Sequence, residues 1–234
     1  MPSDFARFRI TYILIAANIL FFLFSAFVSG SIVDIYNRPL LALGALNGFL
    51  VVYGGEWWRL ISAMFLHGGM THLLMNMFSL YIVGRPMELY FRPRSYLGIY
   101  FLSGIIGGMI SLIMHPQSVG VGASGAIFGI FGALGGYFLE YRRELGDQAK
   151  IIMRDFALII GINLLLGFSV PDIDVSAHVA GMFTGLIGGF IVARHTQRLW
   201  IFLLLSALTI LGLYFYLVTG VSATMPTGMT PLPY

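Results

Sequence analysis

The sequence predicts an all-α protein, a polytopic bundle of membrane-spanning helices. Hydrophobic residues make up 58% of its 234 positions, charged residues only 10%, and the mean hydropathy is +0.88. A soluble domain cannot bury that much apolar surface, because ordinary globular chains carry about a quarter charged residues. No stretch is polar enough to form a separate soluble domain, so residues 1–234 are expected to form a single membrane domain.

Seven apolar segments can cross a bilayer, since a spanning helix needs about 20 mainly apolar residues. They lie at residues 10–28, 70–90, 96–114, 121–139, 156–168 with its flanks, 177–193 and 199–219. The first segment follows Arg7 and Arg9 as the core of a secretion signal would. The apolar run at residues 10–28 is longer than the roughly 7–15 apolar residues of a signal core, so we predict a membrane helix.

The Lys and Arg residues predict the orientation of these spans. One set of span ends carries eleven of them, and the opposite set carries only Arg38 and Arg59. The eleven are Arg7, Arg9, Arg85, Arg92, Arg94, Arg142, Arg143, Lys150, Arg154, Arg194 and Arg198. Cytoplasmic loops hold the excess of positive residues. We therefore expect a cytoplasmic N-terminus, an outer tail over residues 220–234, and a place in the plasma (inner) membrane.

Residues 29–69 are apolar in part but are not predicted to span. Pro39 and several glycines interrupt their apolar runs, and a further crossing would spoil the charge asymmetry. A loop lying in the outer leaflet fits better, with Trp57 and Trp58 at interfacial depth. Thr71 is expected to cap the helix that follows.

Four polar side chains are predicted to lie at one depth. With this topology, the spans at 70–90, 121–139 and 177–193 all begin on the outer side. His72 and Asn76 fall in the first two turns of one, Ser124 in the first turn of the next, and His178 in the first turn of the third. At about 1.5 Å per residue, all four lie within about 10 Å of the outer surface.

These residue types suit a nucleophile with a general base. Ser124 becomes a good nucleophile only when a base takes its proton, and His178 can do so at neutral pH. Attack on an amide carbonyl creates an oxyanion that needs hydrogen-bond donors. His72 and Asn76 are four residues apart and project from one helix face, and the free N–H groups at the start of the Ser124 helix add donors.

Small residues predict close contact between the Ser124 and His178 helices. Gly125, Gly129 and Gly132 line one, and Ala177, Gly181, Gly185 and Gly189 recur every four residues in the other. Such stripes let helix backbones approach in lipid. No carboxylate lies near His178 in its span, so a Ser–His dyad is expected. We expect no cofactor and no metal.

Together these motifs resemble the rhomboid family of intramembrane serine proteases. The resemblance rests on Trp58-Arg59, His67, His72 to Asn76, Gly122-Ala123-Ser124-Gly125 and Ala177 to Gly181, in the family's order over residues 10–193. It implies a six-helix core, with residues 199–219 as an extra seventh helix.

For the site, the resemblance implies Ser124 as nucleophile and His178 as base, with His72, Asn76 and the Ser124 amide forming the oxyanion hole. It also implies that Arg59 and Glu88 hold the outer loop. Many members have Tyr at the position of Phe128. The Phe128 ring can still stack under His178, but it lacks the hydroxyl group that Tyr would offer. Single-pass transmembrane proteins are the implied substrates, and small residues are preferred just before the cut.

Other function classes fit less well. A channel or transporter needs polar groups through the whole membrane thickness, and Asp and Glu are nearly missing from the span interiors. Intramembrane aspartyl proteases need two such Asp residues, and zinc proteases need a His-Glu-x-x-His motif that is absent. No basic cluster suggests nucleic acid. The alternative that stays open is a catalytically inactive rhomboid-like protein that binds transmembrane helices.

Overall fold

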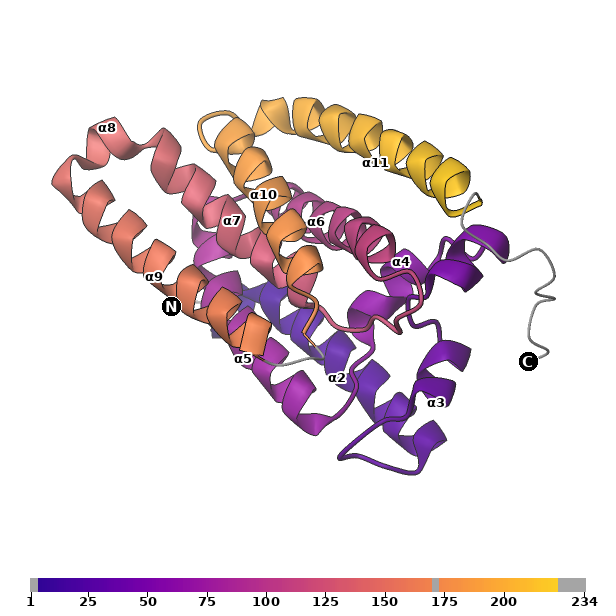
Figure 1. Cartoon of the computed structure of the whole chain (residues 1–234). Coiled ribbons are helices and arrows are strands. Elements are labelled where there is room, and N and C mark those ends of the chain that lie inside the picture. The colour runs from indigo at the N-terminus through magenta and orange to yellow at the C-terminus, as the bar shows by residue number, and fades with distance from the viewer. Residues whose placement is uncertain (1–3, 170–172, 223–234) are drawn as a thin grey trace.

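The computed structural model describes residues 4–169 and 173–222 (Figure 1). Its regular elements in these ranges are helices, joined by loops that contain two isolated β-bridges. The all-α prediction is confirmed. Most of the predicted outer tail, residues 220–234, lies outside the described residues.

Seven long helices match the seven apolar segments. They are α2 (Arg9–Ser29), α5 (Met70–Tyr90), α6 (Pro93–Met114), α7 (Ser124–Glu140), α9 (Asp147–Ser169), α10 (Val175–Val192) and α11 (Leu199–Ser222). Short elements lie between them: α1 (Asp4–Arg7), α3 (Asn37–Ala42), the π-helical turn η1 (Phe49–Tyr53), α4 (Arg59–Ser62), η2 (Ala63–Phe65), α8 (Arg142–Leu145) and η3 (Thr196–Arg198).

Four stretches in the described part of the chain are long and apolar enough to cross a membrane. They are Arg9–Ser29, Pro93–Met114, Val175–Val192 and Thr196–Gly220. Helix α7 is apolar but has only 17 residues. Helix α5 has 21 residues but carries Arg85 and Glu88 near its end. Seven crossings therefore remain a prediction.

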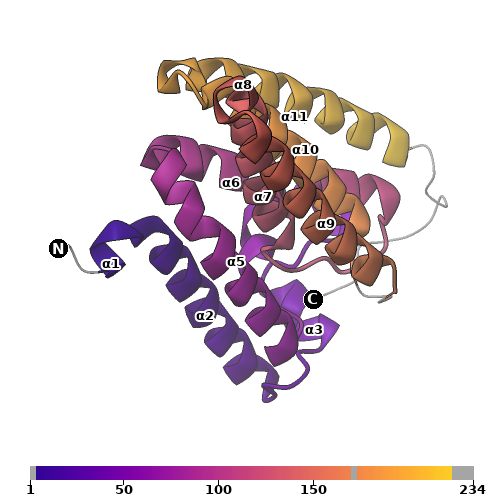
Figure 2. The same cartoon turned by 90° about the vertical axis from the view of Figure 1, so that its left-hand side faces the viewer.

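Helix α7 lies at the centre of the bundle. Eleven of its 17 residues are buried, from Gly125 to Gly136, and it contacts α5, α6, α9 and α10. Helices α2 and α5 pack together, and α11 lies on the opposite side of the bundle from α2 in both views (Figures 1 and 2). The residue that begins α7, Ser124, therefore lies among several helix ends.

Glycines bring α7 and α10 into backbone contact. A Cβ added at Gly181 would lie 2.1 Å from the Gly125 carbonyl oxygen, and one at Gly185 only 1.8 Å from that of Gly129. No side chain fits in such a space, so the two backbones touch directly. The predicted small-residue contact is confirmed.

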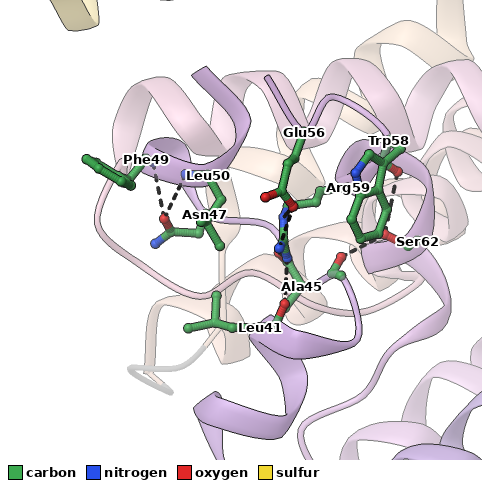
Figure 3. Close-up of polar contacts among 10 residues, drawn as sticks. Leu41, Ala45, Asn47, Phe49, Leu50, Glu56, Trp58, Arg59 and Ser62 are labelled. Atoms are coloured by element: carbon green, nitrogen blue, oxygen red, sulfur yellow. Dashed lines mark hydrogen bonds and ion pairs between the residues drawn. The ribbon is translucent and has the colours of Figure 1, made fainter. Parts of the chain in front are cut away.

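The expected pairing of Arg59 with Glu88 is wrong. Arg59 forms an ion pair with Glu56 at 2.6 Å and donates to the carbonyl oxygens of Leu41 and Ala45 (Figure 3). Glu88 accepts from the backbone N–H groups of residues 10 and 11, at 3.0 and 2.8 Å, at the start of α2. Glu88 lies in the last turn of α5, whereas Arg59 lies in α4, before α5 begins. At about 1.5 Å per residue, the 21 residues of α5 span about 30 Å, which keeps the two side chains apart.

The predicted cap at Thr71 is also wrong. Helix α5 begins at Met70, with Gly69 at the capping position and no side-chain hydrogen bond there. The preceding loop supplies the acceptors instead, because the Met70 N–H lies 3.2 Å from the Ile32 carbonyl oxygen. Thr71 is already inside the first turn.

Candidate active site

A glycine turn leads the chain into α7. Gly122 has φ +121°, a backbone conformation that side chains other than glycine rarely adopt. Its N–H donates to the Ala63 carbonyl oxygen at 2.9 Å, which ties the turn to the loop before α5. Ser124 is the first residue of α7 and is partly exposed. The N–H groups of a first helical turn have no partner within their helix, so they are free to bind an anion.

His72 faces this turn. A Cβ added at Gly122 would lie 2.8 Å from His72 Nε2 and 2.9 Å from its Cε1, so the imidazole edge lies directly against Gly122. On its other side the ring accepts the Gly68 N–H at Nδ1, over a long 3.5 Å. An accepting Nδ1 leaves the proton on Nε2 of a neutral ring. His72 therefore presents a donor to the space in front of Gly122 and Ser124.

Asn76 lies one turn further along α5 on the same face. It is 5% exposed, and its side-chain nitrogen donates to the His72 carbonyl oxygen at 3.0 Å. The same nitrogen lies 3.9 Å from the position of a Cβ at Gly122. An amide group has two hydrogens to donate. One is used to fix the side chain, and the second is available to a ligand at the turn.

His178 lies on α10 beside the start of α7. Its ring stacks on Phe128 with centroids 4.3 Å apart and planes within 11°, so the stacking expected for this residue is confirmed. The ring is 8% exposed, and its Nδ1 has no hydrogen-bond partner in the described part of the chain. Phe128 is four residues after Ser124, one turn down the same helix. No hydrogen bond joins Ser124 to His178 in this structure.

Asp174 fixes the beginning of α10. Its side chain accepts the Ala177 N–H at 3.1 Å and the Ser176 hydroxyl, in the manner of a helix cap. Partial burial raises the pKa of this carboxyl, but hydrogen bonds from Ser111, Ser176 and the Ala177 N–H outweigh it and hold the pKa below its ordinary value. Sequence reasoning missed this role, although an Asp three residues before the apolar run is a signal for a helix start.

His67 is buried behind His72. It is fully buried, and the two rings meet edge to face with centroids 5.1 Å apart. Burial, with His72 beside it, lowers the pKa of the His67 imidazole to about 3, so the ring is neutral at physiological pH. It packs against the His72 ring.

The four predicted site residues thus come from three helices whose ends meet at Gly122 and Ser124. His72 and Asn76 lie against the turn, and His178 is held one turn down α7. Among the described residues, no group of three or more His, Asp or Glu side chains is arranged to hold a metal ion. The starts of the three helices thus bring a serine hydroxyl, two imidazoles and several N–H donors to the region of Gly122 and Ser124.

Comparison with known proteins shows the family of the chain. The model of the rhomboid domain matches residues 54–195. RHOMBOID-like protein 6, mitochondrial, of Arabidopsis thaliana is 40% identical over 168 residues, which are 70% of this chain and 53% of the relative. Rhomboid protease GluP of Bacillus subtilis is 39% identical over 78% of this chain and 34% of its own length.

A third relative matches over more of its length. Putative rhomboid protease YdcA of Bacillus subtilis is 36% identical over 152 residues, which cover 64% of this chain and 74% of the relative. The chain spans between a third and about a half of the first two relatives. With its rhomboid domain and apolar helices, this chain is an integral membrane protein and belongs to the rhomboid family.

Proposed function

We propose that this protein is an intramembrane serine endopeptidase that cuts transmembrane proteins near the outer boundary of the membrane. The observation that carries the proposal is the convergence on one turn: His72 Nε2 and the Asn76 amide lie against Gly122, two residues before Ser124. Two bacterial relatives named as rhomboid proteases support it.

In the proposed reaction, Ser124 attacks the carbonyl carbon of the scissile amide while His178 takes its hydroxyl proton. The negative charge that develops on the carbonyl oxygen is stabilised by His72 Nε2–H, the free Asn76 N–H and the Ser124 backbone N–H. His178 then gives its proton to the leaving amine nitrogen, and the peptide bond breaks. This leaves the substrate's N-terminal part esterified to Ser124.

Water completes the cycle. His178 removes a proton from a water molecule, and the hydroxide attacks the ester carbonyl carbon. The Ser124 oxygen leaves with the proton from His178, which restores the free enzyme. Ser124 is partly exposed and lies at the end of its helix, so water from the outer side can reach it.

The predicted orientation supports the place of the cut. With a cytoplasmic N-terminus, the starts of α5, α7 and α10 are on the outer side, so the site acts on the outer end of a substrate helix. A regular helix shields its own amide bonds, so the substrate must unwind locally. Gly, Pro or Ser near its outer end eases this step.

The test is cleavage of a single-pass substrate in proteoliposomes. Wild-type protein should cut it, whereas Ser124→Ala and His178→Ala should each abolish cleavage. The double variant should be no worse, since residues that act as one unit are not additive. Chelators should have no effect. Substrate binding without cleavage by the wild type would favour an inactive, helix-binding relative instead.

A further inference from the structure

We propose that the C-terminal helix α11 positions the active site. It acts through residues 41–63 of the outer loop, which lie between α11 and the segment that leads into Ser124. The predicted effect on catalysis rests on the proposed function. The structural coupling between α11 and the site can be tested without an activity assay.

Helix α11 packs along one stripe. Phe202, Ser206 and Leu217 are 1%, 3% and 0% exposed, whereas Leu208 and Leu211 on the other side are at least half exposed. The cytoplasmic half of the stripe lies on the bundle, because the Phe202 ring is 2.8 Å from the position of a Cβ at Gly188. The outer half also lies on α6, since Leu217 shares an apolar cluster with Met109 and Leu112, but it has a second partner.

That partner is the outer loop. Leu217 belongs to an apolar cluster with Leu46, Val51, Leu60 and Ala63 of the loop, together with residues of α6. Trp57 adds a ring contact with Tyr214, with centroids 4.9 Å apart. Helix α11 thus meets the loop through Tyr214 and Leu217, which lie within one turn of each other.

Hydrogen bonds and an ion pair connect the parts of the loop to one another. The buried Arg59 side chain joins Glu56 to the carbonyl oxygens of Leu41 and Ala45, and Asn47 accepts the N–H groups that begin η1 (Figure 3). A displacement at one edge is therefore passed to the other edge.

The opposite edge of the loop holds the segment before Ser124. Leu46 and Gly120 exchange two backbone hydrogen bonds of 2.8 Å, and the Gly48 N–H donates to the Pro116 carbonyl oxygen at 3.0 Å. The Ala63 carbonyl oxygen accepts the Gly122 N–H. Gly122 is the residue against which His72 and Asn76 lie. A continuous series of contacts therefore runs from Leu217 and Tyr214 to the proposed oxyanion hole.

The test uses hydrogen exchange in nanodiscs with Leu217→Ala and Tyr214→Ala, and with Leu211→Ala as a lipid-facing control. The hydrogen-bonded amides of Leu46, Gly48, Gly120 and Gly122 should exchange at least about tenfold faster in both variants. Truncating the buried Leu217, or the Tyr214 ring that contacts Trp57, removes packing and lowers the local opening energy. The amides of α2 and α5 should keep their wild-type rates, and Leu211→Ala should match the wild type throughout.

The catalytic consequence is a lower kcat, by about 2- to 30-fold, with KM close to the wild-type value, as expected for coupling through packed contacts. Wild-type exchange at Gly120 and Gly122 would overturn the inference, and so would equally faster exchange in every helix, which marks α11 as a general stabiliser. If Leu217→Ala does not fold, Tyr214→Ala and Trp57→Ala give the same test. An inactive wild type with the expected exchange pattern would count against the proposed function alone.

Discussion

The Asn76 side chain is held by one hydrogen bond and leaves a second donor free. Removing one oxyanion donor typically lowers kcat by about 10²–10³-fold. We therefore expect Asn76→Ala to lose about that much activity while it stays folded and binds substrate with a similar KM. His72→Ala should behave alike. Steady-state cleavage kinetics in detergent measure the kcat and KM of both variants. Wild-type rates would contradict the proposed role and show that His72 and Asn76 serve only in helix packing.

Gly122 is required for two independent reasons, its positive φ and the ring of His72. An added methyl group would lie 2.8 Å from His72 Nε2, so Gly122→Ala should displace the imidazole and strain the turn. We expect at least about a 100-fold loss of kcat, as for loss of an oxyanion donor. Gly212→Ala is the matched control, because nothing lies within 4 Å of its added Cβ. Equal activity of the two variants would contradict the geometry of this turn.

At the residue scale, the sequence pointed to candidate side chains but not to their hydrogen-bond partners. Ser124, His178, His72 and Asn76 could be chosen from residue type and depth alone. The pairing of Arg59 could not, because the loop folds back so that carbonyl oxygens of residues 41 and 45 surround the guanidinium. The role of Gly122 depends on a dihedral angle and a neighbouring ring, neither of which a single sequence reveals.

At the scale of helices, the contact between α7 and α10 sets the distance between the proposed nucleophile and base. A Cβ at Gly185 would meet backbone atoms of Gly129 at 1.8–2.7 Å, and a backbone cannot move as a flexible side chain can. Gly185→Ala should therefore separate the helices and lower both activity and thermal stability. Overpacking of this kind costs about 1–3 kcal/mol.

Gly161→Ala in α9 is the control for Gly185→Ala, since nothing lies within 4 Å of a Cβ added at Gly161. It should unfold at the wild-type temperature or slightly above, because Ala favours helix over Gly by about 1 kcal/mol. Thermal unfolding in detergent, followed by circular dichroism, checks the pair. A Gly185→Ala variant as stable and active as the wild type would contradict direct backbone contact.

The positions of the helices were largely predictable because long apolar runs have few alternatives in lipid. Each predicted segment overlaps a helix, and the limits of the 70–90 segment agree. The segment predicted at 156–168 with its flanks corresponds to the longer α9, which begins at Asp147 among charged residues that hydropathy excludes. The capping residue of α5 was predicted wrongly, because the Met70 N–H bonds to distant backbone carbonyl oxygens and not to a nearby side chain.

At the scale of the whole molecule, orientation can be tested directly because the chain has no cysteine. Ser118→Cys lies in the loop before α7, and Gln148→Cys lies near the start of α9; both positions are exposed. In intact cells, a membrane-impermeant maleimide should label the first variant and leave the second unlabelled until the cells are opened. The reverse labelling pattern would show that the chain has the opposite orientation, with the site at the inner surface.

The most direct measurement is covalent labelling by a fluorophosphonate, which reacts only with a serine activated as a nucleophile. Wild-type protein in detergent should take up one probe, and mass spectrometry of its peptides should place the probe on Ser124. The variants Ser124→Ala and His178→Ala should take up none, while Gly161→Ala should label like the wild type. A probe on any other serine, or a folded wild-type protein that takes up none, would contradict the assignment of Ser124 and His178.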